Sequence, residues 1–331
     1  MPEAPPEPLL AVEHLGVRFG ALPAVRDVGF ALNRGTTLAI VGESGSGKSV
    51  TCLSLIGLLP ASAMVTGTAR LEGTDLLSAT ERELRRVRGR RVGLVYQDPM
   101  GALDPMRTIG SQVREPLLLH LGMRRRDANA RAAELLGTVG IPSPRQHLRA
   151  YPHELSGGMQ QRVVIAMAIA CEPVLLLADE LTTALDVSVQ AQILELLTDL
   201  TERLHLSLVI VSHDLSVVAG MADRILVMYN GAVVEEGPAD RIFAHPEHPY
   251  TRGLLASIPD FAEDPDAPLT GIPGHAPGPG EAVMGCSFAP RCPHCFERCT
   301  QDEPELTETA GGHRAACWLA SPSVRAPAGN P

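Results

Sequence analysis

Short continuous apolar runs recur along this chain of 331 residues, with longer segments of mixed apolar and polar positions between them. Runs of about four to eight apolar residues are typical of strands that are buried on both faces. The runs occupy residues 37–41, 92–96, 174–180, 207–211, 224–229 and 232–236. Because segments with helical character separate several of them, the pattern predicts a mixed α/β core.

Residues from about 105 to 160 show a different pattern. Ile109 to Leu121 and Asp127 to Val139 read as amphipathic helices, and no strand-like run lies between them. We therefore expect a helical subdomain inside the α/β core.

The segment Gly42–Ser49 reads Gly-Glu-Ser-Gly-Ser-Gly-Lys-Ser, a complete phosphate loop. It lies between the predicted strand 37–41 and a predicted helix over 48–59, which is the context that this motif requires. Its glycines let backbone N–H groups point at an anion, and the helix N-terminus adds a positive dipole end. We expect Lys48 to reach the β- and γ-phosphates of a nucleotide and Ser49 to hold Mg²⁺. The predicted ATP contacts here are Gly42, Ser44, Gly45, Ser46, Gly47, Lys48, Ser49 and Val50. Taken alone, the segment could also be a glycine-rich turn before a helix.

Two acids follow the apolar run that begins at Val174. Asp179 is placed where phosphate-loop NTPases have a Mg²⁺-coordinating carboxylate. Glu180 can accept a proton from a water molecule that attacks the γ-phosphate. Paired acids after a strand often only cap a helix or face water, but behind a phosphate loop the catalytic interpretation is favoured.

The segment Ser156-Gly157-Gly158-Met159-Gln160 resembles the signature sequence of ATP-binding cassette (ABC) ATPases. Further landmarks of that family follow in the same order along residues 9–257. They are Phe19, which lies 23 residues before Gly42, then Gln97, the segment Thr183–Asp186 and His213. The resemblance implies an ABC-type phosphate-loop NTPase fold with an inserted helical subdomain.

The resemblance also implies roles for these residues. Two cassettes face each other head to tail, so that Ser156, Gly157, Gly158 and Gln160 act on the ATP bound by the partner. Gln97 and His213 join Glu180 in catalysis, and Gln97 joins Ser49 and Asp179 around Mg²⁺. Asp186 contacts the partner, and Phe19 stacks on adenine. The chain departs from the family at Leu181, where a proline is usual, which restores an N–H donor beside Glu180.

Composition limits the environment of the protein. The sequence has 28 Lys and Arg against 38 Asp and Glu, a net charge of −10, which argues against nonspecific binding to nucleic acid. The first residues, Met1 to Pro8, have neither the basic nor the apolar part of a secretory signal. No stretch approaches the roughly 18 uncharged apolar residues of a membrane span. Any membrane role is therefore expected to be peripheral, and the family resemblance implies the cytoplasmic face of the cell (inner) membrane.

Five of the seven cysteines lie in the tail: Cys286, Cys292, Cys295, Cys299 and Cys317. Cys52 and Cys171 have apolar neighbours and are expected in the core. A reducing compartment disfavours structural disulfides, so metal ligation is the leading interpretation of the tail. Thiolates bind iron–sulfur clusters or Zn²⁺, and the spacing does not decide between these and no metal at all.

The tail from Gly285 to Cys317, with the stretch Pro246–Leu255, resembles the C-terminal extension of oligopeptide, dipeptide and nickel importer ATPases. In some members of that family four such cysteines hold a [4Fe–4S] cluster. The resemblance implies Cys286, Cys292, Cys299 and Cys317 as ligands here. A Pro- and Gly-rich segment over 265–280 is expected to be a linker, which divides the chain into an ATPase domain at 1–258 and an extension at 259–331.

We therefore expect the ATP-hydrolysing subunit of a membrane importer for peptides, with ATP and Mg²⁺ as ligands. The alternatives are import of nickel or another small solute, and a soluble ABC ATPase that is not coupled to transport. The family implies a second cassette subunit, two transmembrane permease subunits and an extracytoplasmic binding protein as partners.

Overall fold

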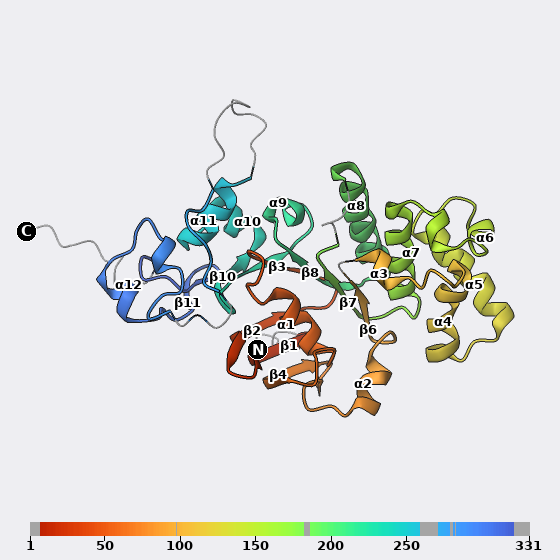
Figure 1. Ribbon diagram of the computed structural model, residues 1–331, viewed down its shortest axis with the longest axis horizontal. Helices are drawn as coiled ribbons and strands as arrows, with labels where there is room; N and C mark the ends of the chain where they lie inside the picture. Colours follow the sequence, from red (N-terminus) through yellow and green to blue (C-terminus); the bar gives the residue numbers. More distant parts are fainter. Residues whose placement is uncertain are drawn as a thin grey trace, which may run out of the picture. The chain divides into compact units, whose positions relative to one another are not determined.

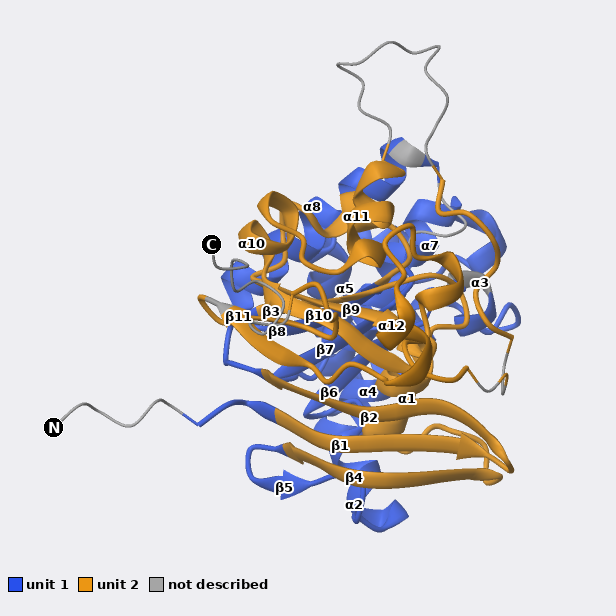
Figure 2. Cartoon of the chain, turned by 90° about the vertical axis from the view of Figure 1, so that its left-hand side faces the viewer, with its two compact units in different colours: residues 1–10, 32–36, 71–211 blue, residues 11–31, 37–70, 212–331 orange. Residues whose placement is uncertain are grey.

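A computed structural model describes residues 7–96, 98–181, 186–258, 271–278, 281 and 283–320. The chain forms two compact units, which are coloured separately in Figure 2. Unit 1 comprises residues 1–10, 32–36 and 71–211, and unit 2 comprises residues 11–31, 37–70 and 212–331. Each unit is described by itself.

Unit 2 contains two sets of strands (Figure 1). In the first, β1 (Leu10–Phe19) lies between β2 (Leu22–Leu32) and β4 (Ala63–Leu71). In the second, β3 (Thr37–Val41) pairs in parallel with β9 (Arg224–Tyr229), and β10 (Ala232–Pro238) pairs antiparallel with β9. The tail extends this second set, because β12 (His313–Ala315) pairs antiparallel with β10 and β11 (Thr307–Ala310) pairs with β12.

The helices of unit 2 are short. They are α1 (Lys48–Leu55), α9 (Leu215–Val218), α10 (Ala239–Ala244), α11 (Pro249–Ala256) and α12 (Glu297–Gln301), with a 3₁₀ turn η2 at Ala289–Arg291. The predicted helix over 48–59 ends early. Gly57 adopts a left-handed conformation with φ of 61°, which α-helical geometry does not allow.

Unit 1 contains three parallel strands. Strand β7 (Leu175–Asp179) pairs with β6 (Val92–Val95) on one side and with β8 (Ser207–Ser212) on the other. Every residue of β7 and β8 is buried, as expected for parallel strands covered on both faces. This unit also contains β5 (Thr74–Asp75) and the helices α2 (Glu81–Val87), α3 (Pro99–Ala102) and α8 (Val187–Leu204).

The segment predicted to be helical forms a group of helices in unit 1. They are α4 (Ile109–Leu121), α5 (Arg125–Thr138), α6 (Pro144–His147), the 3₁₀ turn η1 (Pro152–Glu154) and α7 (Gly157–Ile169). The predicted bounds of α4 are confirmed. Helix α5 begins two residues before Asp127, which lies in its first turn, where a carboxylate interacts favourably with the helix dipole.

The six apolar runs all form strands, which confirms the predicted α/β core. In the predicted linker over 265–280, the described residues 271–278 form no helix or strand, and the other half lies outside the described residues. The domain boundary at 258 stays a prediction. Among the described helices, none combines the length and the apolar character that crossing a bilayer requires.

Candidate functional site

The loop from Gly42 to Gly47 connects β3 with α1 in unit 2. Gly42 has a φ of 151° and Gly47 a φ of 100°. A Cβ atom on Gly42 would lie 2.2 Å from the backbone oxygen of Met228, and one on Gly47 would lie 2.6 Å from that of Ala24. The loop therefore needs glycine at both positions, for conformation and for space.

Lys48 begins α1 and is 3% exposed. Its ammonium group donates hydrogen bonds to the backbone oxygens of Gly42, at 2.8 Å, and of Glu43, at 2.9 Å. Helix α1 has no side-chain cap at Gly47, and the first N–H groups of a helix can bind an anion. The hydroxyl of Ser46 is buried and has no hydrogen-bond partner within the described structure. A bound phosphate would give that hydroxyl an acceptor.

Asp179 and Glu180 lie at the carboxyl end of β7 in unit 1. Asp179 is 6% exposed. Glu180 adopts a left-handed conformation with φ of 43°, and its N–H donates to the backbone oxygen of Val211 at 3.1 Å. Seven other described residues besides glycines share this left-handed conformation, so the assignment of Glu180 rests on its place after β7. Leu181, at the position of the usual family proline, is buried at 3% exposure.

Ser156 is the N-cap of α7, and its hydroxyl accepts a hydrogen bond from the N–H of Met159 at 3.4 Å. Ser156 and Gly157 are exposed, so this helix N-terminus is open to a ligand. Gln160 is instead buried, and its amide donates to the backbone oxygens of Pro152 at 2.8 Å and Leu155 at 3.2 Å. Its contacts therefore fix the loop that precedes the helix.

The remaining predicted residues have varied positions. Phe19 ends β1 and is half-buried, Val50 lies half-buried in α1, and His213 is exposed after β8. Asp186 caps α8 by accepting from the N–H of Val189 at 3.0 Å, and its hydrogen bond from Ser188 lowers the pKa of its carboxyl group. Gln97 and residues 182–185 lie outside the described residues.

Comparison with known proteins identifies the family. Residues 25–183 match the family "ABC transporter", and residues 234–299 match "Oligopeptide/dipeptide transporter, C-terminal region". The chain is 47% identical over 300 residues to the oligopeptide transport ATP-binding protein AppD of Bacillus subtilis, covering 90% of this chain and 91% of that protein. It is 46% identical over 314 residues to the dipeptide transport ATP-binding protein DppD of Escherichia coli, covering 93% and 96%. The chain belongs to the ATP-binding subunits of the oligopeptide and dipeptide ABC transporters.

A solved structure supports the same assignment. The dimeric post-hydrolysis state of the ATP-binding cassette MJ0796, bound to ADP and Pi, is similar with a TM-score of 0.62 and 29% identity. The match covers 70% of this chain and 98% of the MJ0796 chain. As a member of this family the chain is an ABC transporter ATPase, with the α/β phosphate-loop NTPase fold and the helical subdomain that the sequence predicts.

The metal site predicted in the tail of this ABC ATPase is matched only by the placement of its four cysteines. Among the described residues, no three His, Cys, Asp or Glu side chains are arranged to hold a metal ion. The four predicted ligands do line one narrow cavity of about 20 Å³, together with His248 and Phe288, which is room for about one water molecule. Burial raises the pKa of the Cys286 thiol to about 11. Cys295, which was not among the four predicted ligands, has an exposed side chain. Cys52 and Cys171 are buried, as predicted.

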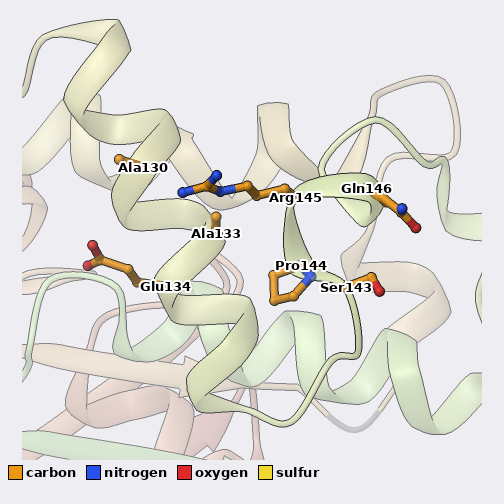
Figure 3. A pocket seen from close by; sticks show the side chains of 7 residues that line it. All are labelled: Ala130, Ala133, Glu134, Ser143, Pro144, Arg145 and Gln146. Atoms are coloured by element: carbon orange, nitrogen blue, oxygen red, sulfur yellow. The ribbon is translucent and has the colours of Figure 1, made fainter.

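A second cavity, of about 480 Å³, lies in the helical region of unit 1 (Figure 3). Ala130, Ala133 and Glu134 line it from α5, and Ser143 to Gln146 line it from the loop and α6. None of these residues belongs to the ATP-site motifs.

The sequence did not point to two residues that contact the phosphate loop in unit 2, Tyr250 and Arg291. The N–H of Glu43 donates to the hydroxyl of Tyr250 at 2.7 Å, and the carboxylate of Glu43 accepts from Arg291. The resemblance in Pro246–Leu255 includes Tyr250 but gives it no role, and Arg291 is 248 positions from Glu43.

Proposed function

We propose that this subunit hydrolyses ATP to drive the uptake of oligopeptides or dipeptides across a membrane. The observation that carries the proposal is the phosphate loop between β3 and α1, in a chain similar over nearly its whole length to peptide-transport ATPases. Within the loop, the buried Lys48 and the unpartnered Ser46 hydroxyl fit a triphosphate.

In this proposal Lys48 neutralises charge on the β- and γ-phosphates. Ser49, Asp179 and Gln97 would hold Mg²⁺, and this ion, when bound, would withdraw charge from the phosphate oxygens. Glu180 accepts the proton of the attacking water, and His213 orients that water and the γ-phosphate. Phe19 stacks on the adenine. Each step adds positioning or charge stabilisation, which is the main means of catalysis in phosphoryl transfer.

A second cassette completes each site. The exposed N-terminus of α7, with Ser156, Gly157 and Gly158, would donate to the γ-phosphate of the ATP on the partner, and Asp186 would contact that partner. ATP binding then closes the pair, and hydrolysis reopens it, because ATP binds the closed state more tightly. The proposed assembly holds a second, distinct cassette, two permease subunits and an extracytoplasmic binding protein, with this subunit peripheral at the cytoplasmic face.

The experiment is reconstitution of the full transporter in vesicles, with the ATPase rate measured against candidate solutes. Peptides added with the binding protein should raise the rate. Stimulation by Ni²⁺ alone would favour the nickel alternative, and a high rate for the isolated subunit at dilution would favour an ATPase that is not coupled to transport. Lys48→Ala should abolish nucleotide binding, whereas Ser156→Arg should leave this subunit's own binding intact and impair the partner's site.

We further propose that the tail takes up an iron–sulfur cluster on Cys286, Cys292, Cys299 and Cys317. The support is that these four thiols line the same cavity although they span 32 positions of sequence, and that four thiolates suit such a cluster. Because the cavity has room for about one water molecule, the tail must open around the thiols when the cluster binds. Anaerobic purification followed by iron and acid-labile sulfide analysis tests this. Cys286→Ser should lose the iron and the exposed Cys295→Ser should keep it. Zinc that depends on Cys295 would favour a zinc site, and a sample without metal would refute both.

A further inference from the structure

Arg291 and Glu43 form a bidentate ion pair within unit 2. One guanidinium nitrogen, Nη1, donates to Oε2 of Glu43 at 2.7 Å, and Nη2 donates to Oε1 at 2.9 Å. The Arg291 side chain is only 5% exposed and that of Glu43 27%. Paired parallel hydrogen bonds between arginine and a carboxylate fix both position and orientation.

The rest of the Arg291 side chain is held from several sides. Its Nε donates to the backbone oxygen of Pro273 at 2.9 Å. Its guanidinium carbon lies 5.8 Å from the ring centre of Tyr229 and 5.9 Å from that of Phe288. The hydrogen bonds to Glu43 are the main reason that the pKa of Arg291 is raised, so the group stays charged. A guanidinium fixed in this way can impose its geometry on the carboxylate that it binds.

Glu43 is the second residue of the phosphate loop, and its backbone is also constrained. Its N–H donates to the Tyr250 hydroxyl at 2.7 Å. Its backbone oxygen accepts from Nζ of Lys48 at 2.9 Å and from the N–H of Ser46 at 3.2 Å. A shift of Glu43 would therefore move a hydrogen-bond partner of the lysine that is assigned to the phosphates.

Tyr250 and Arg291 approach Glu43 from segments far along the chain. Tyr250 lies in α11 and is fully buried, with its ring centre 4.7 Å from that of Tyr229 and 5.4 Å from that of Phe288. Arg291 ends the turn η2 of the tail. The tail thus reaches the loop through one packed aromatic and ionic cluster, formed by Tyr229, Tyr250, Phe288 and Arg291.

We propose that Arg291 is a positioning residue for ATP binding: it holds Glu43, with Tyr250, so that the phosphate loop keeps its binding-competent shape. The tail of this ATPase is then a part of the nucleotide site. A buried ion pair is by itself weak evidence for stability, and its place on the phosphate loop gives this one a specific function. The inference rests on the assignment of residues 42–49 as the phosphate loop in the proposed function.

The test is a double-mutant cycle with Glu43→Gln, Arg291→Met and the double variant, in the full chain. The dissociation constant of a fluorescent ATP analogue is measured at equilibrium. Each single variant should bind about tenfold more weakly, and the double variant should bind no more weakly than either, because all three lose the same contact. In the reconstituted transporter the KM for ATP should rise by a similar factor with little change in kcat.

Controls separate this role from a general loss of folding. Trp318, the single tryptophan of the chain, lies in the tail and reports by its fluorescence whether the tail is folded. Glu305→Gln changes an exposed side chain of the same tail and should leave ATP affinity unchanged. Unchanged affinity in a folded Arg291→Met protein, or additive effects of the two single changes, would overturn the proposal. Lys48→Ala tests the assignment of residues 42–49 as the phosphate loop separately from the role of Arg291. Normal ATP binding by Lys48→Ala would refute the phosphate-loop assignment itself.

Discussion

The carboxylate of Glu235 lies 2.7 Å from Nε2 of His313, and neither side chain is exposed to solvent. Glu235 belongs to β10 and His313 to β12. The same carboxylate accepts hydrogen bonds from the N–H groups of Glu247 at 2.6 Å and His248 at 3.0 Å. The tail is therefore joined to β10 by a buried polar contact in addition to the strand pairing.

Replacing His313 with leucine should destabilise unit 2. Glu235 would keep two backbone donors but lose its buried side-chain partner, and such a loss costs about 3 kcal/mol of unfolding free energy. Urea unfolding followed by Trp318 fluorescence measures it. Glu305→Gln, at an exposed position of the same tail, is the matched control. Equal midpoints for His313→Leu and the wild type would show that the contact contributes no stability.

Gly47→Ala should weaken nucleotide binding by more than about tenfold. The new Cβ would lie 2.6 Å from the backbone oxygen of Ala24 at a φ of 100°, so the loop must shift to accommodate it. Equilibrium titration with an ATP analogue measures the change. Gly73→Ala introduces a similar strain at a φ of 79° in open space and should leave binding unaltered. Equal affinity of the two variants for the ATP analogue would show that the close approach at Gly47 does not matter for nucleotide binding.

Glu180→Gln should slow ATP hydrolysis by roughly 10²–10⁴-fold, which is the range for the loss of a positioned general base. ATP affinity should be retained, and the ATP-bound cassette pair should accumulate because it can no longer reopen by hydrolysis. Steady-state rates of the reconstituted transporter and size-exclusion chromatography with ATP measure both effects. Glu195→Gln, on the exposed side of α8, serves as the control. A wild-type rate in Glu180→Gln would disprove the assignment.

His248 should make stability depend on pH. Burial is the main reason that its pKa falls from 6.5 to about 4. The charge of Arg252 lowers this pKa further, and the charge of Glu235 raises it. Its Nδ1 accepts the N–H of Tyr250 at 3.0 Å, so protonation also removes the cap of α11. Between about pH 6.5 and 4 the unfolded chain binds more protons at this residue. The free energy of unfolding should therefore fall by up to roughly 3 kcal/mol as the pH falls through that window.

Urea unfolding at several pH values checks this dependence. His248→Asn keeps a side-chain acceptor for the cap but does not titrate, so its stability should depend less on pH in this window. The carboxylates common to both proteins cancel in the comparison. Parallel pH profiles for the variant and the wild type would rule out His248 as the source.

Six strands of the core and both bounds of α4 could be predicted from the sequence because their signals are local. The run from Thr37 to Val41 is apolar at every position but one, and Thr108, the N-cap of α4, directly precedes the predicted helix. The phosphate loop was equally recognisable, since backbone conformation at Gly42 and Gly47 restricts which residues are possible. Helix α1 was predicted too long because the left-handed turn at Gly57 outweighs the apolar residues that follow.

Residue types at short, fixed spacings were sufficient to predict the ATPase motifs, the order of the core elements and the family. The contacts that surround those motifs became apparent only in the folded protein. Arg291 meets Glu43 across 248 positions and His313 meets Glu235 across 78, and neither pair has any local pattern. Such contacts form only when the strands and the tail pack, because packing removes the water that would otherwise solvate each charge.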